Sequence, residues 1–220
     1  MIALRPHGIA YALLMADHLK LAGLPAQLQQ AELERIIRSS PLLMDVLCGL
    51  RDEGLPQGLL VAGAIYNLVW NRLTGRPDLT GINDIDIFYF EPGDISYEAE
   101  DAVIRRLELR FKHLPLPVQV RNQARVHLWF TAKFGVPFAP LGSAAEMLGR
   151  YASRTHAVGV RLEADGRLAV VAPFGLDDIF SFRIVPNYAL ANRRAHEAKA
   201  ARARSIWPEL TIFPWLDTPD

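Results

Sequence analysis

Hydrophobic residues in the first quarter of the chain recur at intervals of three and four, which is the spacing of one face of a helix. A first helix is expected to end at Gly23, because Pro25 follows it closely as a second stop signal. The same spacing predicts further helices over residues 27–40 and 41–54. We therefore interpret residues 1–56 as an N-terminal helical region that packs on the rest of the chain.

In residues 57–220, short apolar runs alternate with longer amphipathic stretches, a pattern typical of strands interleaved with helices. Strands are expected over residues 58–62, 83–90 and 117–120, and helices over residues 64–73, 97–114 and 192–207. Residues 156–174 are expected to form a β-hairpin, because the turn residues 164–166 separate two alternating runs. The sequence thus predicts an α/β (α+β) fold: a short mixed β-sheet flanked by helices, in one compact core with a C-terminal helix.

Composition narrows the classes of function. The chain of 220 residues carries 24 basic and 24 acidic side chains, so its net charge does not indicate nucleic acid as a partner, and any such partner would need a local patch. The single cysteine, Cys48, excludes an intrachain disulfide. The sequence has no run near the roughly 20 apolar residues that span a bilayer, so we expect no membrane partner. The expected location is the cytoplasm.

Asp84 and Asp86 stand one residue apart at the start of the predicted strand 83–90. Side chains two positions apart in a strand project from the same face, so the two carboxylates should lie together. Two close carboxylates repel unless a cation lies between them, and hard divalent ions prefer such oxygen ligands. The pair therefore predicts a Mg²⁺ (or Mn²⁺) site. The alternative interpretation places both residues at the solvent end of the strand, where they cap a turn.

Gly63 lies directly between the predicted strand 58–62 and the helix that follows. A glycine there lets the N–H groups of a helix N-terminus approach a phosphate, although a plain strand-to-helix turn also uses glycine. A glycine turn followed by an acidic pair on the next strand is typical of nucleotidyltransferases, in which the turn holds the triphosphate and the carboxylates hold the metal.

Four segments, AGAIYNLVWN, NDIDIFYFE, VRNQARVHLWF and APFGLDDIF, occur in this order along the chain. Together they resemble a bacterial group of nucleotidyltransferase-like proteins, formerly a domain of unknown function, within the polymerase-beta-like superfamily. The resemblance covers roughly residues 40–210. It implies a nucleotidyltransferase fold with the active site at the edge of its sheet, and an NTP substrate. It does not imply a particular acceptor.

The resemblance assigns roles to several residues. Gly63 and Ala64 match the phosphate-binding turn, where Ala64 lacks the hydroxyl that the superfamily often has. Asp84 and Asp86 match the metal-binding and catalytic pair. The third catalytic position, normally a carboxylate on a neighbouring strand that acts as base, falls on Gln119, whose amide cannot usefully accept a proton. Two nearby acids offer alternatives for the missing carboxylate, Glu91 and Asp94.

Further polar residues are candidates for nucleotide binding. Asn122 and Arg125 follow the strand 117–120, where Arg125 would hold a phosphate and Asn122 a base or ribose; alternatively, they form an interior network that ties helix to sheet. Asn67 lies on the helix after Gly63 and is expected to face the nucleotide. The basic residues of the C-terminal helix are interpreted as a solvated face, with RNA binding as an alternative.

The function predicted from these observations is metal-dependent transfer of a nucleoside monophosphate from an NTP to the hydroxyl of an unidentified acceptor. The alternative is a degenerate nucleotidyltransferase that binds a nucleotide or a partner without catalysis, which Ala64 and Gln119 favour. A phosphatase with Asp84 as nucleophile fits less well, because that chemistry requires Ser or Thr just after the pair, where Ile87 and Phe88 stand.

Overall fold

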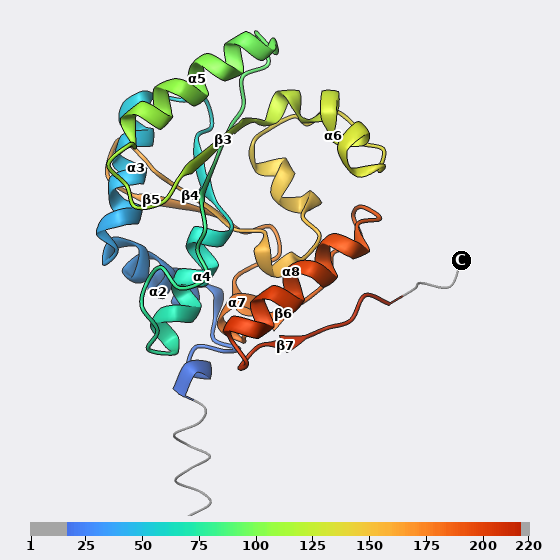
Figure 1. Ribbon diagram of the computed structural model, residues 1–220. Helices are drawn as coiled ribbons and strands as arrows, with labels where there is room; N and C mark the ends of the chain where they lie inside the picture. The colour runs from blue at the N-terminus through green and yellow to red at the C-terminus, as the bar shows by residue number, and fades with distance from the viewer. Residues whose placement is uncertain (1–16, 217–220) are drawn as a thin grey trace, which may run out of the picture.

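The computed structural model describes residues 17–216. Its centre is a five-stranded mixed sheet in the order β3-β2-β1-β4-β5 (Figure 1). The strands are β1 (Leu59–Val61), β2 (Ile85–Tyr89), β3 (Val118–Asn122), β4 (Gly159–Leu162) and β5 (Leu168–Val171). β2 and β3 run parallel, and the other neighbouring pairs are antiparallel. The predicted fold class is confirmed, and the predicted hairpin is the β4–β5 pair.

Helices surround this sheet on both sides (Figure 1). The α-helices are α2 (Ala26–Arg38), α3 (Pro41–Glu53), α4 (Gly63–Leu73), α5 (Tyr97–Arg110), α6 (Val126–Phe134), α7 (Asp177–Phe180) and α8 (Arg193–Ile206). Short 3₁₀ turns are η1 (Asp17–Leu19), η2 (Gln123–Arg125), η3 (Ala145–Arg150) and η4 (Arg154–His156). Most of the first predicted helix lies outside the described residues, and the remaining predicted helices are confirmed with small shifts at their ends.

Local chemistry explains the bounds of α3. The Ser40 hydroxyl accepts a hydrogen bond from the Leu43 N–H, and Pro41 occupies the first helical position, where its missing N–H removes no bond. Gly54 ends the helix in the left-handed conformation, at φ 63°. α2 and α3 share one hydrophobic cluster with the sheet. The division of one compact domain into a helical region, residues 1–56, and a core, residues 57–220, stays a prediction.

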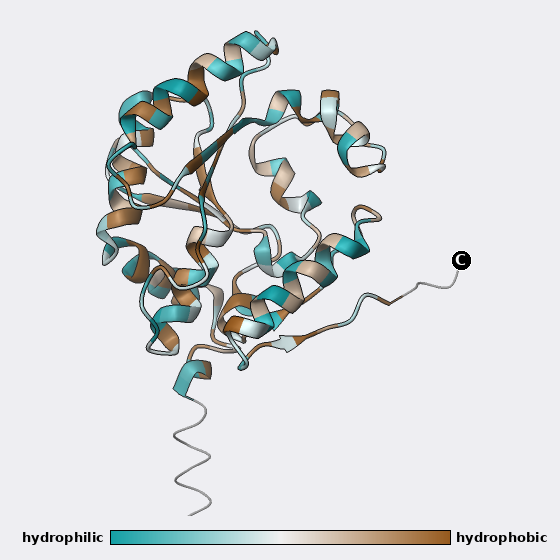
Figure 2. Ribbon diagram, viewed as in Figure 1, coloured by the Kyte–Doolittle hydropathy of each residue, from teal (hydrophilic) through white to brown (hydrophobic). Residues whose placement is uncertain are grey.

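β2 divides its side chains between two faces of the sheet. Ile85, Ile87 and Tyr89 are buried in the main cluster together with residues of α2, α3 and α4. Phe88 points to the opposite face, where it packs in a smaller cluster with Leu59 of β1. Burying each large apolar side chain stabilises the fold by about 1.5–3 kcal/mol, so the alternation fixes the register of β2. Figure 2 shows the resulting hydrophobic strands inside a more polar shell.

α8 joins the body of the protein through its C-terminal end. Trp207, just after the helix, is buried against Trp70 of α4, with ring centroids 5.2 Å apart. Its indole N–H donates to Asn71 Oδ1 at 3.0 Å, and the Asn71 amide donates to the carbonyls of Asp78 and Thr80. Residues beyond α8 form β7 (Thr211–Ile212), which pairs with β6 (Arg183–Ile184) in a small second sheet that the sequence pattern did not predict.

Candidate active site

The predicted site residues on three adjacent strands are neighbours in space. Asp86 of β2 is the register partner of Val61 at the end of β1 on one side, and of Gln119 in β3 on the other. Asp84, Asp86 and Gln119 line one cavity of about 280 Å³. The two aspartates therefore lie on the same face, as the strand spacing predicts, and the face is that of Phe88 and the smaller cluster.

Gln119 occupies the place where a third carboxylate was expected. Its amide Nε2 donates a hydrogen bond to Asp84 Oδ2 at 2.6 Å, which fixes one carboxylate of the pair. The two alternative acids lie beyond the opposite end of β2 and outside the cavity: Glu91 Oε1 accepts from the Gly93 N–H, and Asp94 Oδ1 accepts from the Ser96 N–H. Neither Glu91 nor Asp94 therefore replaces the missing carboxylate.

Asp86 is held in an environment that disfavours its charge. Burial, and then the nearby Asp84 carboxylate, raise the pKa of Asp86 from 3.8 to about 6. Lys199 and Arg121 oppose this rise. No salt bridge joins Asp84 or Asp86 to a basic side chain within residues 17–216. A bound cation would relieve the repulsion between the two carboxylates.

The turn between β1 and α4 forms another wall of the cavity. Ala62 has an unusual backbone conformation, with φ 57° and ψ −118°. It directly precedes Gly63, the residue that the sequence pattern indicated for this turn. The Ala62 carbonyl accepts the first helical bonds, from the N–H groups of Ile65 and Tyr66. As at any helix N-terminus, the N–H groups of Gly63 and Ala64 have no intrahelical partners and can bind an anion.

Of these turn residues, Ala62 and Gly63 line the cavity. The Ala64 side chain is buried in the main hydrophobic cluster, so only its backbone N–H is suited to a ligand. Asn67, one helical turn further on, lines the cavity as expected, but its amide donates to the Gly81 carbonyl at 3.2 Å. Asn67 therefore orders the loop that leads to Asp84 and presents only part of its surface to a ligand.

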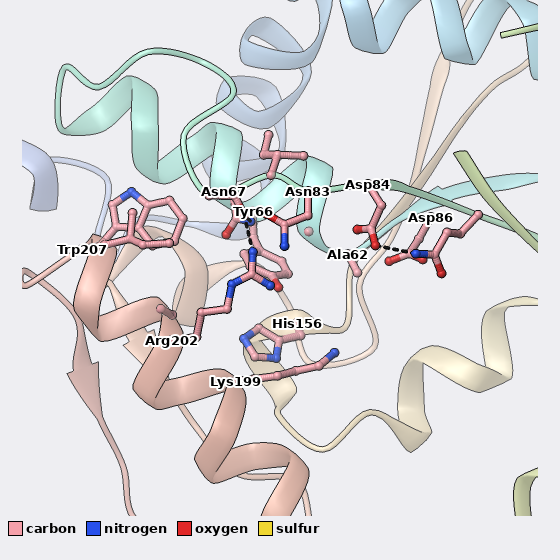
Figure 3. Close-up of a pocket in the computed structure, with 16 residues that line it drawn as sticks. Ala62, Tyr66, Asn67, Asn83, Asp84, Asp86, His156, Lys199, Arg202 and Trp207 are labelled. Carbon is pink, nitrogen blue, oxygen red and sulfur yellow. Dashed lines mark hydrogen bonds between the residues drawn. The ribbon is translucent and has the colours of Figure 1, made fainter. Parts of the chain in front are cut away.

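Two cations of the site were missed by the sequence analysis. Lys199 and Arg202 of α8 line the cavity, and Figure 3 shows both reaching into the space that Asp84 and Asp86 enter from the sheet. Arg202 Nη2 donates to the Gly81 carbonyl at 3.0 Å. The two residues are three positions apart, hence on one helical face, and they precede the anchoring Trp207. The interpretation of the helix as a solvated face overlooked this spacing, which could have identified the two cations.

An uncharged pair of rings forms the inner wall. Tyr66 and His156 both line the cavity and stack with ring centroids 4.7 Å apart, at an interplanar angle of 24°. Burial, and then nearby Lys199, hold the pKa of His156 well below its usual range, so its imidazole is neutral at pH 7. Burial, and then Asp86, raise the pKa of the Tyr66 hydroxyl. The charges of the cavity therefore come from the aspartates on one side and α8 on the other.

Gly81 is required by close packing beneath the cavity. Its φ is +73°, and a Cβ atom added there would lie 2.4 Å from Cη2 of Trp207. Because Trp207 is buried and hydrogen-bonded, it has little room to shift. The approach of the loop to Trp207 thus sets the path of the chain into Asn83 and Asp84.

Asn122 and Arg125, predicted to contact the nucleotide, lie outside the cavity. Asn122 exchanges two hydrogen bonds with the backbone of Glu91, at 2.9 and 3.0 Å. Arg125 forms a buried ion pair with Glu100 of α5 and donates from Nε to the Ile95 carbonyl at 2.8 Å. Their positions therefore give a nucleotide-binding role no support, because both side chains are engaged in the interior network that was the alternative interpretation.

Comparison with known proteins shows the family to which the chain belongs. A family model described as "Nucleotidyltransferase" matches residues 49–212, and the chain belongs to this family. An NMR structure described as revealing a CCA-adding enzyme head domain matches with a TM-score of 0.68 and 26% sequence identity, over 84% of this chain and 96% of that one. No curated protein matches the chain. By family and fold, the protein is a nucleotidyltransferase, as the four sequence segments indicate.

Two further properties of the described residues bear on other predictions. Within residues 17–216, no helix is long and apolar enough to cross a membrane. The same residues hold no group of three or more His, Cys, Asp or Glu side chains arranged to bind a metal, which agrees with an amide at the third position of the site. The cytoplasmic location stays a prediction.

Proposed function

We propose that the protein transfers a nucleoside monophosphate from an NTP to a hydroxyl of an acceptor, in a metal-dependent reaction at the cavity beside Asp84 and Asp86. The observation that carries this proposal is the distribution of charge: a carboxylate pair on one side, and Lys199 and Arg202 on the other. A triphosphate is polyanionic, so its oxygens are attracted to the cations of α8, while the carboxylates attract a divalent ion that neutralises the remaining phosphate charge.

The residues present fit a Mg²⁺ or Mn²⁺ ion held partly by substrate. Mg²⁺ is commonly bound by one or two carboxylates together with waters and substrate phosphates, and Asp84 and Asp86 supply such a pair. The raised pKa of Asp86 supports this assignment, because a cation between the carboxylates would lower the cost of ionising it. When bound, the ion would polarise the phosphate under attack and neutralise charge on the leaving group.

The reaction balances as follows. The acceptor hydroxyl oxygen forms a bond to the α-phosphorus of the NTP, and the bond from that phosphorus to the bridging oxygen of the pyrophosphate breaks. The hydroxyl proton passes to solvent water, because the amide of Gln119, which stands beside Asp86 in the sheet, cannot accept it. The N–H groups at the start of α4, with Lys199 and Arg202, hold the triphosphate and stabilise the departing pyrophosphate.

Gln119 favours a second candidate function, nucleotide binding without catalysis. Its amide binds Asp84 directly and cannot serve as a base. Loss of a positioned base typically slows a reaction about 10²–10⁴-fold, so a protein with this substitution either transfers nucleotides slowly or only binds them.

A labelling experiment separates the two candidates. The full chain is incubated with each α-labelled NTP, with Mg²⁺ or Mn²⁺ and a cell extract as the source of acceptors, and label is sought on RNA, protein and small molecules. Transfer that is lost in Asp86→Asn and retained in Glu91→Gln supports the enzyme, because Glu91 lies outside the cavity, beyond the other end of the same strand. NTP binding with no transfer to any acceptor supports the binding function. Transfer that persists in Asp86→Asn contradicts the proposed site.

A further inference from the structure

A second cavity lies next to the first and is larger, at about 580 Å³. It is lined by residues of α6, of the segment around η3 and of the first turn of α8. The two cavities share His156 and Lys199. A molecule in the second cavity would therefore lie within reach of a nucleotide in the first, which is the position that the acceptor of a transfer reaction must occupy.

One wall of this cavity is aromatic. Trp129, Phe130 and Phe134 of α6 line it, with Phe130 and Phe134 ring centroids 4.7 Å apart. Phe134 is 52% exposed, an unusual position for a ring that could be buried. Lys133 Nζ lies 5.5 Å from the Trp129 ring centroid and 5.3 Å from that of Phe134. Exposed aromatic faces beside a cation are a platform on which planar bases stack.

Basic residues from separate elements also line the cavity, beside apolar residues such as Met147 and Ala152. Lys133 of α6, Arg150 of η3, and Arg194 and Lys199 of α8 line the cavity, Arg150 being paired with Glu146 at 3.2 Å. Cations spread over three elements suit several anions spaced along a ligand, as phosphodiesters are in a polynucleotide. The overall charge of the chain is zero, so this concentration of basic residues is local.

The start of α8 adds two features. Its second residue, Arg194, lines the cavity, and Arg193 beside it is paired with Glu197 at 2.7 Å. Asn192, which precedes the helix and lines the cavity, has its Oδ1 atom buried and without a hydrogen-bond partner among the described residues. An N–H donor of a ligand, such as the amino group of a base, would satisfy this acceptor once the Asn192 side chain turns toward the cavity.

We propose that this second cavity, which we call the aromatic cleft, binds the hydroxyl-bearing end of a single-stranded polynucleotide as the acceptor of the transfer. The inference rests on the proposed function for the reaction, but the binding itself does not depend on the first cavity. Bases stack on Trp129 and Phe134, the backbone phosphates contact the cations of α6 and α8, and the terminal hydroxyl points past Lys199 toward Asp86.

Binding of a short labelled oligonucleotide to the full chain tests the inference. Fluorescence anisotropy is measured with eight-residue single-stranded RNA and DNA at low salt, without NTP, for wild type, Trp129→Ala, Arg194→Ala and Leu128→Ala. Stacking on an aromatic ring contributes about 1–3 kcal/mol per base, so Trp129→Ala should weaken binding about 5- to 160-fold. Leu128, an exposed α6 residue outside the aromatic cleft, is the matched control and should bind as wild type.

Further readouts distinguish a local effect from unfolding and from failure of the proposed function. Trp129→Phe should restore most of the affinity, and calorimetric binding of Mg·NTP should be unchanged in Trp129→Ala. Failure of wild type to bind either oligonucleotide overturns the inference, as does equal binding by Trp129→Ala, or equally tight binding of poly-glutamate, which would indicate an acidic protein partner. If the oligonucleotide does not bind while label is transferred to a small molecule, the inference fails and the proposed function stands.

Discussion

The two ends of the β2–β3 strand pair carry charged residues in opposite ways. At the C-terminal end, the buried Glu100 carboxylate is paired with Arg125 and accepts the Asn122 N–H, so the protein itself satisfies the charges. At the N-terminal end, the Asp84 carboxylate accepts a side-chain hydrogen bond only from the neutral amide of Gln119 within the described residues, and Asp86 has a raised pKa. Charges paired within the fold are costly to break and leave nothing for a ligand to neutralise, whereas charges left without a counter-ion indicate where a ligand binds.

The largest effect is expected at the C-terminal end of the strand pair, where Arg125 is paired with Glu100. Arg125→Ala leaves the Glu100 carboxylate buried and unpaired, and removing one partner of a buried ion pair costs about 3–5 kcal/mol. Urea unfolding should show this loss, while Mg·NTP binding measured below the unfolding transition should stay within twofold of wild type. A loss of stability under about 1 kcal/mol, or a loss of nucleotide binding by the folded variant, would reverse the roles assigned to the two ends.

Gly81→Ala should be next in size. The substitution combines a left-handed φ with a Cβ atom 2.4 Å from Trp207, and we expect a loss of about 3 kcal/mol together with weaker Mg·NTP binding. Gly75→Ala is the matched control, because Gly75 has a similar φ of +67° and no atom within 4 Å of the added Cβ. Equal losses in the two variants would show that the contact with Trp207 does not set the loop before Asp84.

Asp86→Asn should stabilise the metal-free protein. The folded pKa of Asp86, about 6, lies above the unfolded value of 3.8, so the native state binds more protons and stability falls as the pH rises from about 4 to 6. Two pKa units correspond to about 2–3 kcal/mol, which the variant should gain at pH 7.5 and should not gain at pH 3.5. Thermal unfolding in EDTA at both pH values measures the difference, and a destabilised variant at pH 7.5 contradicts it.

Lys199→Ala should have the smallest effect. Lys199 is exposed to solvent in part, so we expect Mg·NTP affinity to fall about tenfold, which is about 1.4 kcal/mol, with little change in unfolding. Arg204→Ala is the control, since Arg204 lies on the same helix, lines neither cavity and donates to the Leu210 carbonyl. Equal affinities for the two variants would show that Lys199 does not contribute to nucleotide binding.

Sequence patterns predicted the sheet, most helices and the position of the carboxylate pair because these depend on local periodicity. The position of Gln119 on a neighbouring strand followed from the family resemblance, and the sheet register then places it beside Asp86. The cations Lys199 and Arg202 were not predicted, because their position depends on Trp207 packing on Trp70 and Asn71, more than 100 residues away in the chain. The positive φ of Ala62 was likewise missed, because alanine gives no signal of a backbone that usually requires glycine.

The same dependence on packing between distant residues explains why the surroundings of Arg125 could not be predicted from sequence. An arginine after a strand, close to other polar residues, has the composition of a phosphate site, but its role depends on whether a carboxylate lies opposite. That carboxylate is Glu100 of α5. In the sequence, Glu100 is only one of several acidic residues at the start of an amphipathic helix. Both partners are buried, so Arg125 lies in an interior ion pair that no local pattern predicts.

Calorimetric titration of Mg·NTP into the metal-free chain tests the central claim most directly. All four NTPs are titrated into wild type, Asp86→Asn and Glu91→Gln, the last a carboxylate outside the cavity at the opposite end of β2. We expect wild type and Glu91→Gln to bind at least one NTP with equal affinity, and Asp86→Asn to bind it at least about tenfold more weakly. Equal affinity in all three proteins would contradict the assignment of the site to Asp84 and Asp86.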